Sequence, residues 1–276
     1  MFAIPRLRLL GALAIGSALA VLLALVAYSP AAQAHHSWGK YHWARTSNPF
    51  TLNLADNVSS QWDPYLRTTS SDWSASSVLD TPVISGTRNP TTCNPTSGRV
   101  EVCNAAYGPN GWLGLAQIWI SSRQHIVAGT TKVNDTYFST QKYNTDAWRN
   151  MVMCQEVGHT FGLDHQDENH TNTNLGTCMD YTNDPSGTLG TNGTLSNEHP
   201  NQHDYDQLEL IYKHLDSTTT VARASAASTL PPAGSRGNLN SRAQWGRLIE
   251  ESRNEQLALY ERDFGGKKLF TFVILA

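Results

Sequence analysis

Residues 155–165 of the chain read QEVGHTFGLDH. On an α-helix, positions i and i+4 lie on one face, so the side chains of Gln155 and His159 can converge on one point. Glu156 lies one residue further round the helix, within reach of a water molecule held at that point. Gly162 lets the backbone leave the helix in a left-handed turn, which brings His165 back as a third ligand. Glu, His, Gly and His at these offsets arise by chance in only ~1 in 1,000 chains or fewer, so the spacing predicts a metal centre rather than a capped helix with two surface histidines.

A methionine follows this stretch at a distance that also carries information. Residues 176–181 read GTCMDY, and Met179 comes fourteen residues after His165. With His in place of Gln155, the first stretch would match the extended signature H-E-x-x-H-x-x-G-x-x-H. In these two stretches the chain resembles the metzincin zinc metalloproteases, whose Met-turn runs beneath the metal. The similarity extends over roughly residues 45–216 and is strongest in the two stretches themselves.

Different branches of that family share different features with the chain. The GLDH sequence at 162–165 is similar to the matrixins. Met179 followed two residues later by Tyr181 is closer to astacins and serralysins, in which a tyrosine at this position lies beside the metal. Residues 111–116, GWLGLA, resemble the upper-rim strand with which matrixins align their substrate.

The resemblance implies a fold, a reaction and a set of site residues. The fold is α+β, with a mixed twisted sheet, an active-site helix, a Met-turn and a C-terminal helix. The activity is zinc-dependent hydrolysis of peptide bonds in extracellular proteins. The implied zinc ligands are Gln155, His159 and His165. The other implied site residues are Glu156 as general base, Tyr181 as oxyanion donor, Met179 beneath the metal, and Leu115 and Ala116 as the substrate-aligning edge.

Gln155 is the residue that departs from the family signature, and it stands at the position of a metal ligand. Zinc sites normally take imidazole nitrogen, thiolate sulfur or carboxylate oxygen. The amide oxygen of Gln is a weaker, harder donor of the kind that suits calcium or magnesium better, so we expect looser zinc binding. The alternatives are a metal-binding relative with feeble catalysis and an inactive binding protein on the same scaffold, although the retained Glu156 argues against the latter. His170 or Asp167 is a further candidate ligand in place of Gln155.

The first 34 residues have the features of an export signal. A basic start precedes an apolar run at 9–26, and Ala32-Gln33-Ala34 is a small-residue cleavage site. The run is long enough to span a membrane, but Pro30 and the cleavage site favour removal. We therefore expect a secreted protein with no stable membrane insertion after cleavage.

Export makes disulfides permissible, and four cysteines allow three pairings. Cys93 and Cys103 bracket a short Asn-Pro-Thr-Ser-Gly stretch and have the spacing of a local clip. A Cys154–Cys178 bond fits the metzincin resemblance, because it would join the metal helix to the Met-turn. Four buried free thiols are the alternative, and the absence of a C-x-x-C pair argues against a cysteine-rich metal site.

Charge and composition exclude some classes of partner. The net charge is -3 and 16% of residues are charged, which leaves no basic face for nucleic acid. The expected partners are protein or peptide substrates, and we expect a monomer. Calcium bound by the loops rich in Asp and Asn is a further expectation, in addition to zinc.

The pattern of apolar residues predicts the order of elements. Strands are predicted at 50–54, 83–86, 98–103, 113–120 and 125–133, and helices at 63–79, from 145 through the metal motif, and at 204–215. The helix that carries the motif begins at the signal Asn144-Thr145-Asp146. His199, His203 and His214, near the last helix, are interpreted as surface or packing residues.

The chain divides into four predicted segments. A signal peptide at 1–34 precedes a metallopeptidase-like domain at 35–216, and residues 217–240, rich in Ser, Thr, Ala, Pro and Gly, are typical of a flexible linker. Residues 241–276 are predicted to be a small appendage built on a β-hairpin around Gly265-Gly266. Because a hairpin of this size is not stable alone, it either packs on the main domain or binds an outside partner.

A rival hypothesis comes from the N-terminus. Cleavage after Ala34 would leave His35 as the first residue, followed by His36 and His42. Copper-dependent polysaccharide monooxygenases resemble this at one point, since a terminal histidine binds copper there together with a second histidine. An N-terminal histidine also arises by accident of cleavage. The bound metal separates the alternatives: zinc for a peptidase, copper for an oxidase and none for an inactive relative.

Overall fold

The computed structural model describes residues 35–121, 124–190, 193–222, 239–252 and 256–276. The predicted signal peptide at 1–34 and most of the predicted linker lie outside these residues, so both stay predictions. Within the described ranges, every helix is too short or too polar to span a bilayer.

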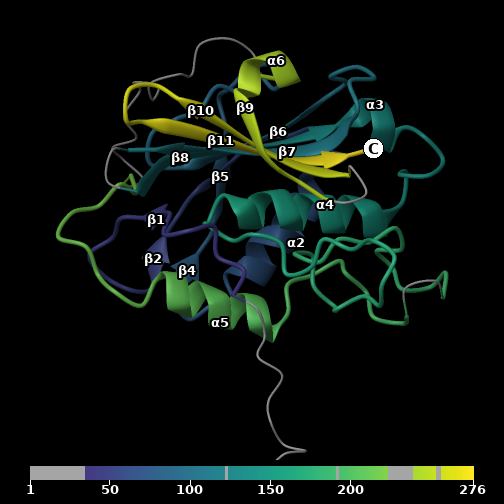
Figure 1. Ribbon diagram of the computed structural model, residues 1–276, viewed down its shortest axis with the longest axis horizontal. Helices are drawn as coiled ribbons and strands as arrows, with labels where there is room; N and C mark the ends of the chain where they lie inside the picture. The colour runs from purple at the N-terminus through teal and green to yellow at the C-terminus, as the bar shows by residue number, and fades with distance from the viewer. Residues whose placement is uncertain (1–34, 122–123, 191–192, 223–238, 253–255) are drawn as a thin grey trace, which may run out of the picture. The chain divides into compact units, whose positions relative to one another are not determined.

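A mixed sheet forms the centre of the molecule, with nine strands among the described residues (Figure 1). Its main path runs β5 (Val83–Ser85), β3 (Leu54–Asn57), β6 (Val100–Ala105), β8 (His125–Asn134), β7 (Trp112–Ile120), β11 (Lys268–Leu275), β10 (Leu257–Asp263) and β9 (Arg247–Glu251). The pairs from β5 to β8 are parallel, and the pairs from β8 to β9 are antiparallel. β1 (His42–Trp43) pairs in parallel with the first residues of β8, and β2 (Phe50–Thr51) pairs with β4 (Leu79–Asp80) in a separate small sheet.

The central strands are long apolar runs because both faces of the sheet are covered. β7 is buried along its whole length, as a strand with two covered faces requires. One face carries α4 (Asp146–His159), which packs against β7 and β8, and α2 (Asp63–Trp73), which packs against α4. The other face carries α6 (Arg242–Trp245), whose Trp245 joins a cluster with Trp112 and Tyr260. Figure 1 shows α6 and the pair α2 and α4 on opposite sides of the strands.

The C-terminal residues belong to this sheet rather than forming an appendage beside it. β10 and β11 pair as a hairpin around Gly265 and Gly266, both of which have positive φ. β11 also pairs with β7 from Lys268↔Ile120 to Leu275↔Trp112. Residues 35–276 therefore form one unit, and the segment predicted as a small appendage packs on the main domain, one of its two alternatives, and supplies three strands of the sheet.

Two predicted helices end earlier than the apolar pattern suggested. α2 stops at Trp73 because the following Ser and Thr side chains bind backbone instead: Thr81 N–H donates to Ser74 Oγ over 2.9 Å. α5 (Gln202–Ile211) begins with a capping box, in which the side chains of Asn201 and Asp204 each accept the other residue's backbone N–H. The short α3 (Asp135–Phe138) is capped by Asn134.

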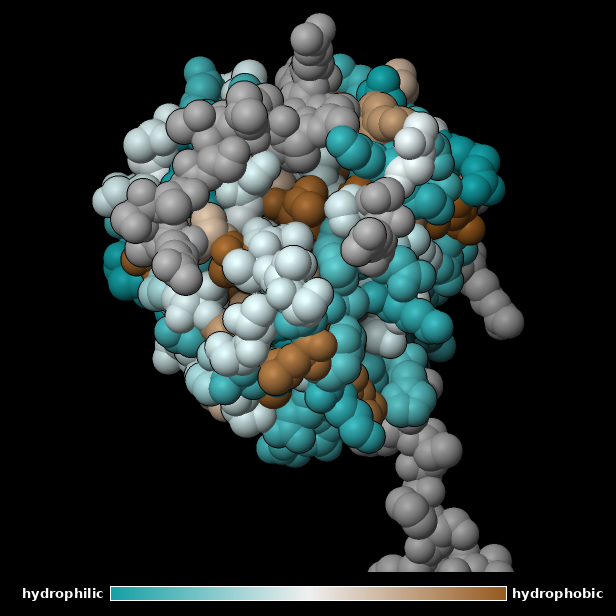
Figure 2. Space-filling view, turned by 90° about the vertical axis from the view of Figure 1, so that its left-hand side faces the viewer, coloured by the Kyte–Doolittle hydropathy of each residue, from teal (hydrophilic) through white to brown (hydrophobic). Residues whose placement is uncertain are grey.

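The face of the molecule turned to the viewer in Figure 2 is mostly hydrophilic or neutral. Its hydrophobic residues form small areas separated by hydrophilic ones. Exposed leucines such as Leu210 and Leu215 are single residues of the kind that any surface carries.

Candidate metal centre

α4 carries the first part of the motif, and its ends are fixed by local interactions. Thr145 Oγ1 accepts the Trp148 N–H over 3.3 Å, and Asp146 places negative charge in the first turn, where the helix dipole favours it. The helix ends at His159, and Gly162 then adopts φ 92°. A Cβ on Gly162 would lie 2.4 Å from the carbonyl oxygen of Tyr41, so a side chain at this turn would meet backbone.

This turn brings His159 and His165 together. Their Nε2 atoms are 3.0 Å apart. The Nδ1–H of His159 donates to the Leu163 carbonyl over 2.9 Å, which leaves its Nε2 with a lone pair. The Nδ1 of His165 faces two carboxylates, 3.6 Å from Asp164 Oδ1 and 3.8 Å from Glu168 Oε1. Burial, and then the neighbouring His165, lower the pKa of His159 well below its usual range, which favours the neutral ligand form.

Gln155 is anchored at one end of its amide and unpartnered at the other. Its Nε2 donates to the carbonyl oxygen of Cys178 over 2.7 Å. Its Oε1 is buried and has no hydrogen-bond partner among the described residues. An orphaned buried amide oxygen costs free energy unless something binds it. One helical turn from His159, this oxygen is chemically suited to be a cation ligand.

The side chain of Glu156 is buried. Glu156 belongs to the same motif as the histidines, and its side chain packs against β7. A Cβ on Gly114 would lie 2.6 Å from Glu156 Oε1, so the glycine makes room for the carboxylate. Neither carboxylate oxygen has a hydrogen-bond partner of normal geometry in the described part of the chain. Burial raises the pKa of Glu156 well above its usual range, and the Ile274 backbone N–H acts weakly in the opposite direction.

The 176–181 stretch runs beneath α4. A Cβ on Gly158 would lie 2.7 Å from Met179 Sδ, which places the methionine directly against the metal-motif helix. A disulfide joins Cys154 in α4 to Cys178 in this stretch, and the other pair is Cys93–Cys103, so both favoured pairings are present.

Tyr181 lies near Glu156, but its hydroxyl is engaged elsewhere. The hydroxyl donates to the carbonyl oxygen of Leu275 over 3.4 Å. Burial raises the pKa of Tyr181, and the nearby Tyr143 and Glu156 raise it further. The C-terminal strand therefore holds the group that was predicted to donate to an oxyanion.

The predicted substrate-aligning edge is already occupied. Leu115 and Ala116 lie in β7, between β8 on one side and β11 on the other, with Val273 opposite Leu115 and Phe272 opposite Ala116. The prediction of a free edge at these residues does not hold in this form of the protein, because the chain's own C-terminal strand forms the ladder that a substrate strand would need.

Phe272 extends this coverage to the histidines, and sequence reasoning gave it no role. Its ring stacks on His159 with centroids 4.4 Å apart and an interplanar angle of 9°. Phe272 also packs edge-on against Trp38. The alternation of Phe270, Phe272 and Ile274 along β11 was the available signal, since it marks one face of a strand that needs a covered surface.

No protein-family model matches the sequence, and a search of curated proteins found no match. Among solved structures, the chain is similar to high choriolytic enzyme 1, a hatching-enzyme zinc protease from Oryzias latipes (medaka fish). The identity is 10%, the TM-score is 0.34, and the match covers 62% of this chain and 94% of that one. These values are too low to carry an inference about this chain, so its function has to be argued from the site itself.

The residues at the motif fit a zinc ion. Zn–N bonds of 2.0–2.1 Å in a tetrahedral site put two nitrogens roughly 3.3 Å apart, close to the 3.0 Å between His159 and His165. The buried, unpartnered Oε1 of Gln155 is the predicted third donor. Of the two suggested substitutes, Asp167 accepts hydrogen bonds from Asn169 and Asn172 in its own loop, and the His170 ring lies 6.1 Å from that of Tyr181, so both stay predictions.

The expectations about calcium and copper find less support. In the described part, two groups of ligand-type side chains lie within 4.8 Å of one another: Asp164, His165 and Glu168, and His42, His214 and Asp216. Both contain imidazole, whereas calcium takes oxygen ligands. The histidines of the copper hypothesis are turned to separate partners, since His36 Nε2 lies 3.0 Å from Asp204 Oδ1 and His42 Nε2 lies 3.1 Å from His214 Nε2.

Proposed function

We propose that the chain is a secreted zinc-dependent endopeptidase whose active site is covered by its own C-terminal strand in the form described here. The observation that carries the proposal is the convergence of the His159 and His165 Nε2 atoms at 3.0 Å beside a buried, unpartnered Glu156 carboxyl. Such a pair of nitrogens with a neighbouring carboxyl has the donor set and the base that metal-assisted hydrolysis requires.

Each residue has a distinct task in the proposed reaction. His159, His165 and Gln155 would hold zinc, which supplies a Lewis acid and lowers the pKa of a water molecule. Glu156 accepts the proton of the water as its oxygen adds to the peptide carbonyl carbon, and returns a proton to the amine nitrogen when the C–N bond breaks. Tyr181, once released from Leu275, donates to the developing oxyanion.

The form in which β11 covers the site is suited to keeping the enzyme inactive rather than to catalysis. β11 pairs with the strand along which a substrate would lie, and Phe272 stacks on His159. Burial raises the pKa of Glu156, so in this dry state the carboxyl holds its proton and is a poor base. Withdrawal of β11 would admit water and substrate together and would free the Tyr181 hydroxyl.

The test uses a variant in which β11 is loosened. Phe272→Ala should hydrolyse a quenched fluorescent peptide, and addition of a zinc chelator should stop the hydrolysis. Phe272→Ala/Glu156→Gln should bind zinc equally well and show no hydrolysis, because Gln cannot accept the proton. Zinc content by mass spectrometry and peptide cleavage are measured on the same preparations.

Two results would contradict the proposal. Equal rates for the single and double variants would exclude Glu156 as the base. Zinc bound without hydrolysis by either variant would favour the alternative of an inactive binding protein on this scaffold, which the covered site also suits.

A further inference from the structure

A second cluster of histidines lies outside the motif and comes from three separate segments. His42 lies in β1, His125 opens β8, and His214 and Asp216 follow α5. The parallel pairing of β1 with β8 sets His42 opposite His125. Their rings are 5.0 Å apart, and the rings of His42 and His214 are 4.5 Å apart.

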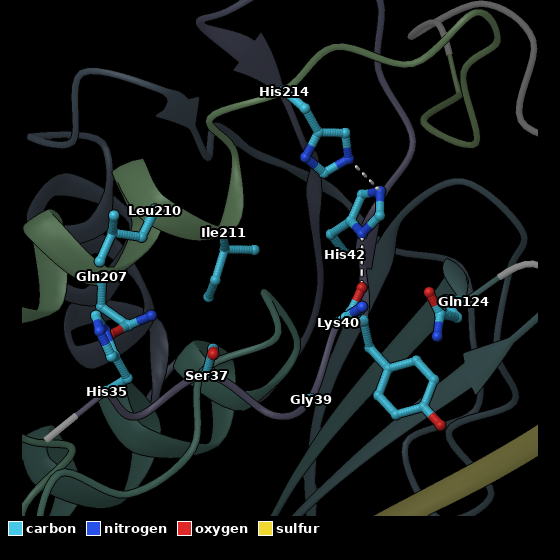
Figure 3. Close-up of a pocket in the computed structure, with 11 residues that line it drawn as sticks. His35, Ser37, Gly39, Lys40, His42, Gln124, Gln207, Leu210, Ile211 and His214 are labelled. Atoms are coloured by element: carbon cyan, nitrogen blue, oxygen red, sulfur yellow. Dashed lines mark hydrogen bonds between the residues drawn. The ribbon is translucent and has the colours of Figure 1, made fainter.

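The ring nitrogens of the cluster point at one another and at one carboxylate. The Nε2 atoms of His42 and His214 are 3.1 Å apart, and Figure 3 shows the two rings turned toward each other. Asp216 Oδ1 lies 3.3 Å from His125 Nε2 and 3.8 Å from His214 Nε2, and Asp216 Oδ2 lies 3.5 Å from His42 Nε2. The His42–His214 and His42–Asp216 separations are close to the roughly 3.3 Å between neighbouring ligand atoms of a tetrahedral zinc ion, and the ligand atoms of His42, His214 and Asp216 all lie within 4.8 Å of one another.

Hydrogen bonds with neighbouring residues hold the His42 and Asp216 side chains in place, as such bonds usually do for metal ligands. The Nδ1–H of His42 donates to the Lys40 carbonyl over 2.8 Å, which turns the Nε2 lone pair towards His214 (Figure 3). The buried Arg45 donates to Asp216 Oδ2 from Nη1 over 2.9 Å and from its backbone N–H over 3.2 Å. Asp216 Oδ1 is left facing the histidines.

Ion pairing alone does not explain this arrangement. One carboxylate already paired with a guanidinium cannot neutralise three imidazolium ions as well, and charged rings at these distances would repel one another. Neutral rings avoid the repulsion, and His125 and His214 can then donate from Nε2–H to Asp216 and His42. The unprotonated Nε2 of a neutral His42 and the Asp216 carboxylate, 3.5 Å apart, are left with no proton between them. A cation shared by His42, His214 and Asp216 accounts for this approach.

We propose that His42, His214 and Asp216 form a second metal site, which binds a divalent ion of the zinc class and which His125 adjoins through Asp216. Two imidazoles and one carboxylate are a donor set that zinc accepts and that calcium and magnesium do not favour. The cluster repeats the arrangement at His159, where Nδ1 donates to a backbone carbonyl and Nε2 meets a second histidine.

The site is open to solvent and adjoins the segment that supports the motif turn. His42 and His214 line a pocket of about 440 Å³, through which an ion can enter. On the other side, the Trp38 N–H donates to the Gly162 carbonyl over 2.8 Å, and the Trp43 indole N–H donates to the Thr160 carbonyl over 2.8 Å. An ion at His42 would brace the segment that holds the turn leading to His165. The second site does not depend on whether the chain is a peptidase.

The test counts zinc equivalents in the full chain after zinc loading and gel filtration. The wild type should retain two. His159→Ala/His165→Ala should retain one, and adding His214→Ala should remove it, as should adding His42→Gln in β1. The matched control is His199→Ala, because the His199 side chain is 52% exposed and that of His214 is 53% exposed, yet His199 pairs only with Asp72 among the described residues. This control should not change the zinc count.

The outcomes separate the two metal proposals. If His159→Ala/His165→Ala retains no zinc, or if its zinc survives both His214→Ala and His42→Gln, the second site is overturned. If the wild type binds one equivalent that His214→Ala removes and His159→Ala/His165→Ala does not, the second site stands and the proposed active site falls. Zinc should also raise the melting temperature of His159→Ala/His165→Ala and leave that of the triple variant with His214→Ala unchanged.

Discussion

At the scale of single residues, the amide of Gln155 is held by its nitrogen and free at its oxygen. Because Nε2 donates to the Cys178 carbonyl, the two ends of the amide are not interchangeable, and Oε1 is the end available to a cation. A histidine at this position would offer a stronger donor to zinc than the amide oxygen does.

Substitution of Gln155 should therefore change zinc affinity in two directions. Gln155→His should tighten zinc binding about tenfold or more, since even changes outside the ligand shell move affinity ~10- to 100-fold. Gln155→Ala should lose zinc at moderate chelator concentration, because two histidines remain. Chelator competition compares the form with Gln155, Gln155→His and Gln155→Ala by their zinc retention. All three carry His214→Ala, so that the second site does not contribute. Equal zinc retention by the Gln and Ala forms would show that Gln155 is not a ligand.

At the scale of elements, the Cys154–Cys178 disulfide ties α4 to the stretch beneath it. The bond closes a loop of 24 residues, which is worth ~3 kcal/mol in the chain-entropy model. Replacing both cysteines by Ser should lower the free energy of unfolding by about that amount. It should also weaken zinc binding, because the Cys178 carbonyl orients Gln155. Urea unfolding and chelator competition measure the two effects.

The other disulfide is the matched control for this prediction. Cys93–Cys103 closes a loop of 10 residues away from the motif. Its removal should cost a similar ~2–3 kcal/mol and leave zinc affinity unchanged. Loss of zinc from both double variants would mean that stability alone, and not the position of Gln155, explains the effect.

β11 is the second element with a testable role, because it covers the proposed active site. Phe272→Ala removes the ring stacked on His159 and should cost about 3–5 kcal/mol of stability. Each 1.4 kcal/mol by which the substitution lowers the free energy needed to release β11 raises the population of molecules with β11 released about tenfold. Peptide hydrolysis should therefore rise at least about tenfold although the protein is less stable.

Leu66→Ala in α2 provides the control for Phe272→Ala. Leu66 is fully buried and lies outside β11. Its truncation should lower the free energy of unfolding by a comparable amount, about 2–5 kcal/mol. It should not raise the rate of hydrolysis. A rise of the same size in both variants would indicate general loosening rather than release of β11.

At the scale of the whole molecule, the C-terminal segment is joined to the core through a buried lysine. Lys132 in β8 donates from Nζ to Asn240 Oδ1 over 2.7 Å. Burial lowers the pKa of Lys132 to about 7 from its usual 10.5. Between these two values the unfolded chain binds a proton that the folded chain does not, so stability rises with pH across this window and is lost as pH falls from 10.5 to about 7.

Comparison with Lys132→Met isolates this contribution. The free energy of unfolding of the wild type relative to Lys132→Met should rise by about 2 kcal/mol between pH 7 and pH 9, measured by urea unfolding at each pH. Lys142→Met, which removes an exposed ammonium, should follow the wild-type pH dependence. A constant difference between wild type and Lys132→Met across this range would show that the buried amine stays charged.

The sequence by itself determined the features that depend on local spacing. The i, i+4 relation within α4, the glycine turn after it and the capping signal at Thr145 all act within a few residues, so the pattern was enough to place Gln155, Glu156 and His159 on one helix. The same holds for the strands β7 and β8, whose apolar runs matched the structure to within one residue at each end.

Only the tertiary structure decided which distant segments meet. An alternating strand such as β11 carries no information about its partner, so its place on β7 over the motif could not be read from its residues. His42 and His214 are 172 positions apart, and their contact depends on the pairing of β1 with β8 and on the path of the chain after α5. Each of these histidines alone has the pattern of a surface residue. Their chemistry arises because the fold places their ring nitrogens within bonding reach of one ion.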